Sequence, residues 1–230
     1  MSDNSSVFKW LVPVLAVLVT LVLVELSLAL VFPVPYSAES NFYFTADPHT
    51  GYLIKPNSTG EFFNKVPANA NANGHNDDYV PKERTEGIYR ILMLGDSFTM
   101  GASVERAEGY PQVLERELNA LSDTPIEVVN TGVGGWDPFQ YAQYYENYGQ
   151  EFDPDLILVG FFVGNDTYWP ERTPADLPTA VMGRRVSRQA ANKANIRAKV
   201  FLYDKFHLAR LIMSGYSGED YDLSRKHCQD

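Results

Sequence analysis

A run of four apolar residues, Ile91 to Leu94, leads directly into Gly95, Asp96 and Ser97. A short, continuous apolar run is typical of a parallel strand that is buried on both faces. Glycine permits a sharp exit from the strand, aspartate favours turns and caps, and the serine stands where a helix could begin. A serine at such a turn presents its hydroxyl at the carboxyl edge of the sheet, where open α/β sheets bind ligands. The same residues would also suit an ordinary strand that ends in a turn.

Two later segments repeat this design. Residues 126–130 have the composition of a second short strand, and a glycine-rich loop follows at 131–136. Residues 156–163 form a third apolar run, which leads into Gly164, Asn165 and Asp166. Three strands that each end in a polar or glycine-rich loop predict a common ligand-binding edge.

Helical segments separate these strands. A helix is expected to start at Tyr110, with Pro111 in its first turn, and a second is expected from Pro138 to Phe152. Strands that alternate with helices through short connections predict an α/β fold with a parallel sheet. Three strands make a small sheet, so one edge is expected to be exposed unless another segment covers it.

The three loops resemble the sequence blocks of the SGNH (GDSL-type) hydrolase family. Residues 95–97 match its serine block, residues 130–135 its glycine block and residues 164–166 its asparagine block, in that order. The resemblance covers about residues 45–215. It implies a three-layer, flavodoxin-like α/β domain with a parallel sheet, which is incomplete here if the carboxyl-terminal block is missing.

The resemblance also implies catalytic roles. Ser97 would be the nucleophile that attacks an ester carbonyl, while the Ser97 amide, the Gly135 amide and the Asn165 side chain would stabilise the oxyanion. A glycine suits the second role because its backbone can approach a ligand closely. The alternatives are a tight turn at Gly135 and a turn or helix cap at Asn165. Asp96 is expected to hold the turn.

The catalytic base is the uncertain part of the pattern. A serine hydroxyl normally needs a histidine that a carboxylate orients, and the family takes both from an Asp-x-x-His segment after further strands. Asp204 and His207 have this spacing, but they follow Asn165 closely and lie within 189–214, where apolar residues have helical periodicity. They are candidates either for a base dyad or for a solvated surface pair. His227 lies in a polar tail without an aspartate three residues earlier.

Two functional hypotheses follow. The first is a membrane-anchored esterase or acyl hydrolase, with the chain a fragment of a longer protein or its base supplied from elsewhere. The second is a catalytically inactive, single-pass subunit that uses a hydrolase-like domain as a docking surface in a larger membrane complex. The three matching blocks favour the first, and the weak candidate for a base favours the second.

The amino-terminal part of the chain predicts a membrane anchor. Residues 11–32 are almost wholly apolar and would span roughly 30 Å as a helix. Trp10 precedes the span, as an interfacial aromatic residue would, and Lys9 is the one basic residue before it. This pattern predicts a single-pass protein with residues 1–10 in the cytoplasm and the main domain in the periplasm or outside the cell. Glu25 within the span suggests a contact with another membrane helix, or a harmless position near its end.

The composition of the remaining segments predicts their structure. Residues 33–87 are rich in Pro, Asn, Gly and aromatic residues and are predicted to be an irregular arm. The α/β domain is expected at 88–214, with a loop or lid from 166 to 188, and a polar tail at 215–230. The formal net charge of −10 argues against nucleic acid, or an anionic lipid surface, as the main partner. The sequence has no metal-ligand cluster and no phosphate-binding loop, so no metal or cofactor is predicted.

Overall fold

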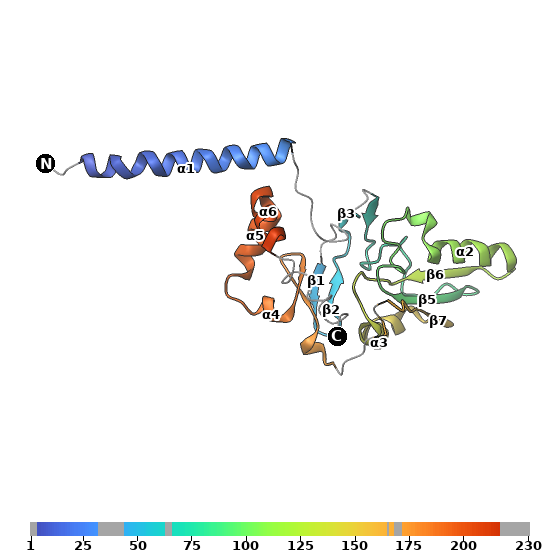
Figure 1. Ribbon diagram of the computed structural model, residues 1–230. Coiled ribbons are helices and arrows are strands. Elements are labelled where there is room, and N and C mark those ends of the chain that lie inside the picture. Colours follow the sequence, from blue (N-terminus) through green and yellow to red (C-terminus); the bar gives the residue numbers. More distant parts are fainter. Residues whose placement is uncertain (1–3, 32–43, 63–65, 165, 168–171, 217–230) are drawn as a thin grey trace.

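The computed structural model describes residues 4–31, 44–62, 66–164, 166–167 and 172–216, with side chains from residue 9 to residue 213. The long helix α1 (Asn4–Val31) projects from a mixed α/β body (Figure 1). Its segment Lys9–Val31 is long and apolar enough to cross a membrane. These bounds agree closely with the predicted span.

A three-stranded parallel sheet lies at the centre of the α/β body. It consists of β5 (Tyr89–Gly95), β6 (Ile126–Asn130) and β7 (Leu156–Gly160) in the order β6-β5-β7. Ile91 of β5 lies opposite Val128 of β6 and Leu156 of β7. The predicted strands and their parallel arrangement are therefore confirmed.

Apolar side chains cover β5 from both sides. Ile91 and Met93 pack against α2 (Tyr110–Leu121) through Leu114 and Leu118. The intervening residues of the strand, Leu92 and Leu94, face a second core on the other side of the sheet. That core includes side chains of α3 (Pro138–Asn147) and of the 3₁₀ helix η2 (Gly149–Phe152). Burial of both sets of alternating side chains explains why β5 is apolar from Ile91 to Leu94.

The segment before the sheet contains two β-hairpins, so the prediction of an irregular arm is wrong there. The first pairs β1 (Phe44–Asp47) with β2 (Gly51–Ile54), and the second pairs β3 (Thr59–Glu61) with β4 (Pro67–Asn69). Their strands have only three or four residues, too few for a clear alternating pattern. They contribute buried side chains to the core that also contains Leu92, namely Tyr52, Ile54, Phe62 and Ala68.

The expected loop at 166–188 contains a further hairpin. The short helix η3 (Pro174–Asp176) leads into β8 (Thr179–Val181), which pairs with β9 (Arg184–Val186). Another short helix, η1 (Arg106–Glu108), lies elsewhere in the domain and precedes α2. The β8–β9 turn uses Met182 and Gly183, both at positive φ. The Phe44 amide donates to the Gly183 carbonyl at 2.9 Å, so this hairpin packs beside β1.

The long helix expected at 189–214 is divided into three. These are α4 (Arg188–Ala191), α5 (Ile196–Lys205) and α6 (His207–Tyr216). Phe206 separates α5 from α6, and its backbone is extended, with φ −123° and ψ 126°. Its amide still donates to the Leu202 carbonyl at 3.0 Å, which closes α5 and lets α6 start in a new direction.

The central position of β5 makes a prediction about stability. Leu92 is fully buried, so Leu92→Ala should lower the free energy of unfolding by about 2–5 kcal/mol. Leu121 at the end of α2 is 87% exposed, and Leu121→Ala should change stability by less than about 0.5 kcal/mol. Thermal or denaturant unfolding of the detergent-solubilised chain measures both. Equal effects of the two substitutions would contradict the burial of β5.

Candidate functional site

Ser97 lies immediately beyond β5, in the turn that ends this strand. The Asp96 carboxylate accepts a hydrogen bond from the Phe98 amide at 2.9 Å, and the Ser97 carbonyl accepts one from the Ala102 amide at 2.9 Å. Asp96 thus holds the turn, as expected. Ser97 is partly exposed, and its hydroxyl and amide have no hydrogen-bond partner among the described residues. No described residue therefore occupies either group, and both can bind a ligand.

The glycine-rich loop after β6 continues along the end of β5. The Thr131 amide donates to the Met93 carbonyl at 3.0 Å, and the Val133 amide donates to the Gly95 carbonyl at 3.1 Å. A Cβ atom on Gly132 would lie 2.4 Å from the Met100 amide nitrogen. Only a glycine allows this loop to lie directly against the serine turn.

Gly135 is at the exposed tip of this loop, with a φ of +76°. The preceding carbonyl, that of Gly134, accepts hydrogen bonds from the Tyr52 hydroxyl at 3.0 Å and from Arg185 Nη1 at 3.0 Å. These two bonds fix the peptide before Gly135, while the Gly135 amide itself has no acceptor within the described part of the chain. This amide is consequently a free donor beside a guanidinium group.

The loop after β7 contains the third predicted site residue, Asn165, which is outside the described residues. The loop around it is closed by Asp166, whose carboxylate accepts hydrogen bonds from the Phe162 amide at 2.9 Å and from the Tyr141 hydroxyl at 3.0 Å. On the outer surface the rings of Phe162 and Phe98 pack with their centroids 4.3 Å apart. The loops that follow β5 and β7 are therefore in direct contact.

The edge of the sheet beneath these loops is electronegative. Burial raises the pKa of Tyr141 strongly, and the charges of Asp166, Asp96 and Asp137 raise it further. Burial also raises the pKa of Asp166, although its hydrogen bonds from Phe162 and Tyr141 oppose this shift. Asp137 caps α3 through the Gln140 amide at 3.2 Å and forms an ion pair with Arg172.

The two candidates for a base dyad lie on α5 and α6, on either side of the break at Phe206. Asp204 accepts hydrogen bonds from Arg184 Nε at 2.8 Å and Nη2 at 2.5 Å. The His207 amide donates to Glu25 Oε1 of α1 at 2.7 Å. Figure 1 shows α6 beside α1, and both α5 and α6 well separated from β5 and β7. The structure thus brings the serine turn and the glycine loop together, and it does not bring Asp204 and His207 to them.

The other described histidines also have partners of their own. His75 Nε2 is 2.7 Å from the Tyr144 hydroxyl, and the His75 ring packs against Phe152 at 5.7 Å. The ring of His49 lies edge-on to Tyr148, with the centroids 6.1 Å apart. His75 therefore packs against α3 and η2, and His49 against Tyr148, the residue between these two helices.

Sequence reasoning missed Arg185 and Tyr52 as residues of this edge. Arg185 comes from the unpredicted β8–β9 hairpin and Tyr52 from the unpredicted β2, and their side chains are 3.2 Å apart at Nη1 and the hydroxyl. A usable signal was present for Arg185. Gly183, which lies between two segments that end in valine, 179–181 and 184–186, is a turn residue and is compatible with a short hairpin loop.

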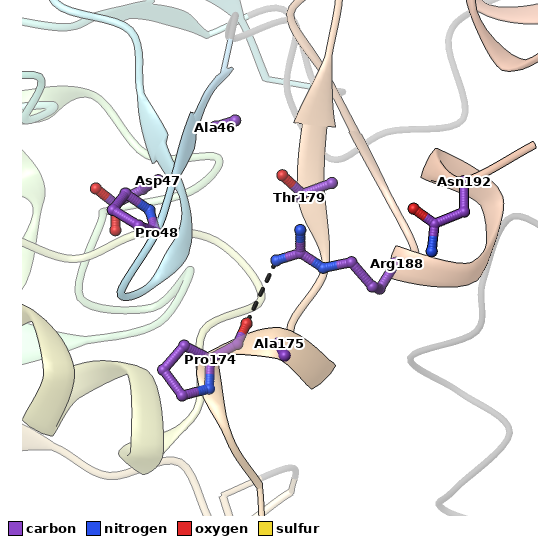
Figure 2. Close-up of a pocket in the computed structure, with 8 residues that line it drawn as sticks. All are labelled: Ala46, Asp47, Pro48, Pro174, Ala175, Thr179, Arg188 and Asn192. Atoms are coloured by element: carbon purple, nitrogen blue, oxygen red, sulfur yellow. Dashed lines mark hydrogen bonds between the residues drawn. The ribbon is translucent and has the colours of Figure 1, made fainter.

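A separate hollow of about 690 Å³ lies between the β1–β2 turn and the 174–192 segment, open to solvent (Figure 2). Its main polar groups are already engaged. Arg188 donates to the Leu177 carbonyl at 3.1 Å and to the Pro174 carbonyl at 3.3 Å, while Asp47 Oδ1 accepts a hydrogen bond from the Thr50 amide at 2.7 Å. This hollow is lined by Ala46, Asp47, Pro48, Pro174, Ala175, Thr179, Arg188 and Asn192, and Ser97 is not among them.

Comparison with known proteins gives no family assignment, because no family model matches the chain and no curated protein matches it. Within the described ranges, no group of three or more His, Cys, Asp or Glu side chains could hold a metal ion. Any function of this edge is therefore inferred from its own residues.

Two ionisable groups are buried near the sheet, and one of them, Asp77, supports the glycine loop. Asp77 Oδ2 accepts the Asn130 amide at 2.9 Å, and Asn130 Oδ1 accepts the Gly132 amide at 3.0 Å. Burial raises the pKa of Asp77 from 3.8 to about 6, against the effect of its hydrogen bonds. Burial also lowers the pKa of His75 from 6.5 to about 4, with a smaller effect of Lys82.

These two pKa shifts have opposite effects on the way in which the stability of the fold changes with pH. Between about pH 4 and pH 6 folded Asp77 binds more protons than unfolded Asp77, so its contribution to stability falls as the pH rises. Between about pH 4 and pH 6.5 folded His75 binds fewer protons than unfolded His75, so its contribution is lost as the pH falls. Each shift of about two units corresponds to roughly 3 kcal/mol. In the wild-type chain the two effects should nearly cancel.

Single substitutions should expose each effect. Relative to the wild-type chain, Asp77→Asn should lose stability by about 3 kcal/mol between pH 6.5 and pH 4, because the His75 effect is no longer opposed. His75→Gln should gain a similar amount over the same interval. Denaturant unfolding of the three proteins at both pH values measures this, and parallel pH profiles would refute the assignment.

Proposed function

We propose that this chain is a membrane-anchored serine esterase or acyl hydrolase of the SGNH type, with Ser97 as its nucleophile. The observation that carries this proposal is the position of Ser97 just beyond the central strand, in a turn whose later residues Thr99 and Met100 lie against Gly132 of the glycine loop. Its hydroxyl and amide lack partners in the described part of the chain, as the Gly135 amide does. An acyl-transfer site needs such unpaired donors near its nucleophile.

The proposed reaction begins when Ser97 Oγ forms a bond to the carbonyl carbon of an ester and gives its proton to a base. The negative charge that develops on the carbonyl oxygen would be stabilised by the Ser97 and Gly135 amides and by Asn165. Collapse of this intermediate breaks the bond to the alcohol, which takes up the proton. Water then attacks the acyl-serine, releases the acid and restores Ser97.

None of the described aspartates and histidines discussed above is placed to act as the base for Ser97. The carboxylates of Asp96 and Asp166 already accept hydrogen bonds from the amides of Phe98 and Phe162. Asp204 pairs with Arg184, and His207 lies beside α1. We therefore propose that an imidazole reaches Ser97 from a segment beyond the described ranges or from a partner chain. The Arg185 guanidinium, next to the Gly134 carbonyl, would favour substrates with a negative charge near the scissile ester.

A fluorophosphonate probe tests whether Ser97 is activated. The full-length chain in its native membrane should be labelled by the probe, and Ser97→Ala should abolish the labelling, because only an activated serine reacts with this electrophile. Ser122, which hydrogen-bonds within its own turn at the end of α2, provides the matched control, and Ser122→Ala should be labelled like the wild type. Folded wild-type protein that remains unlabelled would overturn the enzymatic proposal.

The exposed edge of the sheet favours a second candidate function, a non-catalytic docking subunit of a membrane complex. Strand β7 pairs with β5 on one side, and its apolar side chains are exposed to a degree unusual for a sheet of a monomer. Val159 is 53% exposed and Val163, just beyond the strand, 72%. An exposed apolar strand edge is a surface on which another chain can add a strand.

Purification of the tagged full-length chain distinguishes this candidate. If β7 is a docking edge, the solubilised chain should co-purify with the same partner in repeated preparations, and Val159→Glu should abolish this because a buried unpaired charge is costly. Leu121→Glu, at an exposed apolar position on α2, should retain the partner. A chain that purifies as a monomer, or that keeps its partner in Val159→Glu, would contradict docking through β7.

A further inference from the structure

The basic residues of the chain are concentrated in one segment. Eight of the 19 lysines and arginines lie between residues 184 and 210, where Asp204 is the one acidic residue. The formal net charge of the whole chain is −10, so the remainder is strongly acidic. Most of the exposed cations of this segment lie on or beside α5, namely Lys193, Arg197, Lys199 and Lys205. The average charge of the chain therefore conceals a local basic surface.

The same segment exposes large apolar side chains. They lie on α5, at the break and on α6, and each exposes between 40 and 56% of its surface. The set consists of Phe201, Leu202, Phe206, Leu211 and Ile212. The rings of Phe201 and Phe206 pack edge-on with their centroids 6.4 Å apart, so apolar groups are continuous across the break. A pair of helices with both lysines and exposed Phe, Leu and Ile is typical of segments that lie in a membrane interface.

The contact between α6 and α1 places these side chains at a defined height along α1. The carboxylate of Glu25 accepts hydrogen bonds from the His207 amide at 2.7 Å and from the Leu208 amide at 2.9 Å. Glu25 is six residues from the end of α1, which corresponds to about 9 Å along its axis. If α1 spans the membrane, the first turn of α6 lies about 9 Å inside the end of the span, within the roughly 5–10 Å depth that interfacial helices reach. Figure 1 shows α6 beside the carboxyl-terminal half of α1.

We propose that α5 and α6 form an interfacial membrane-binding element that rests on anionic phospholipid beside the anchor helix. Phe201, Phe206, Leu211 and Ile212 would enter the boundary of the acyl chains, while the lysines would contact the phosphates. The Glu25 carboxylate holds the start of α6 at this depth by satisfying two amides that have no partner within their own helix. The acidic remainder of the domain would be repelled by the same surface, so this element also sets the orientation of the domain.

This proposal requires α1 to be the membrane anchor, and it does not depend on the catalytic role of Ser97. Depth-dependent quenching in lipid nanodiscs, whose two faces are both accessible, tests it on the full-length chain. Cys228→Ser removes the one native cysteine. Single cysteines are then introduced by Leu211→Cys, by Val17→Cys in α1 and by Leu121→Cys on α2, and each carries an environment-sensitive fluorophore.

The expected result differs for each position. In nanodiscs of equal parts phosphatidylcholine and phosphatidylglycerol, the label at 211 should be quenched by lipids with a nitroxide near the headgroup and shielded from iodide. The label at 121 should be quenched by iodide alone, because Leu121 is 87% exposed at the end of α2. The label at 17 should be quenched by nitroxides deep in the acyl chains, which verifies insertion of α1. With Lys199→Gln and Lys205→Gln, nitroxide quenching at 211 should fall to the level found in phosphatidylcholine alone.

Three results would overturn the proposal. If iodide reaches the label at 211 as readily as the label at 121, α6 is in water. If both iodide and the lipid nitroxide fail to reach it, the apolar face is covered by protein and the partner is another chain. A label at 17 that no lipid nitroxide quenches would refute the anchor itself, and the membrane-binding element with it. Circular dichroism of each labelled variant verifies that the fold is unchanged.

Discussion

Burial of β5 on both faces is the constraint on which the rest of this structure depends. A strand in the middle of a three-stranded parallel sheet has neighbours on both edges, and here α2 covers one face and α3 with the hairpins covers the other. Its central residues, Ile91 to Leu94, are accordingly apolar; the buried Arg90 near its start pairs with Glu127 of β6, and the other polar groups occur where the strand ends. Ser97 is the first polar residue beyond the strand that is partly exposed. The loops that follow β6 and β7 begin at the same edge of the sheet, because all three strands are parallel.

The hairpins connect this edge to the part of the domain that lies beside α1. Tyr52 of β2 and Arg185 of β9 both donate to the Gly134 carbonyl, so two hairpins that are distant in sequence support one peptide of the glycine loop. Arg184, the neighbour of Arg185, pairs with Asp204 of α5. Successive residues of β9 point to opposite sides, and one strand therefore links the candidate site to the helices that contact α1.

Charge is distributed so that different surfaces of the domain favour different surroundings. The edge near Ser97 has three aspartates in the electrostatic environment of Tyr141, whereas the segment from 184 to 210 is basic. A surface with lysines and exposed aromatic side chains suits a phospholipid interface, and an acidic surface is excluded from an anionic one. The contact between Glu25 and α6 joins this basic segment to α1, so the orientation of the domain is coupled to the position of this apolar helix.

The sequence by itself determined the elements whose pattern is local and repeated. These include the apolar helix α1, the three short strands and the turn at Ser97, because an unbroken apolar run and the turn residues that follow it can be recognised within a few positions. Only the tertiary structure decided the hairpins before the sheet, the break at Phe206 and the partners of Asp204 and His207. Those features depend on contacts such as Arg184 with Asp204 and Glu25 with Leu208, which join residues far apart in the chain. Local periodicity contains no information about such pairs, because each residue alone would suit a solvated surface equally well.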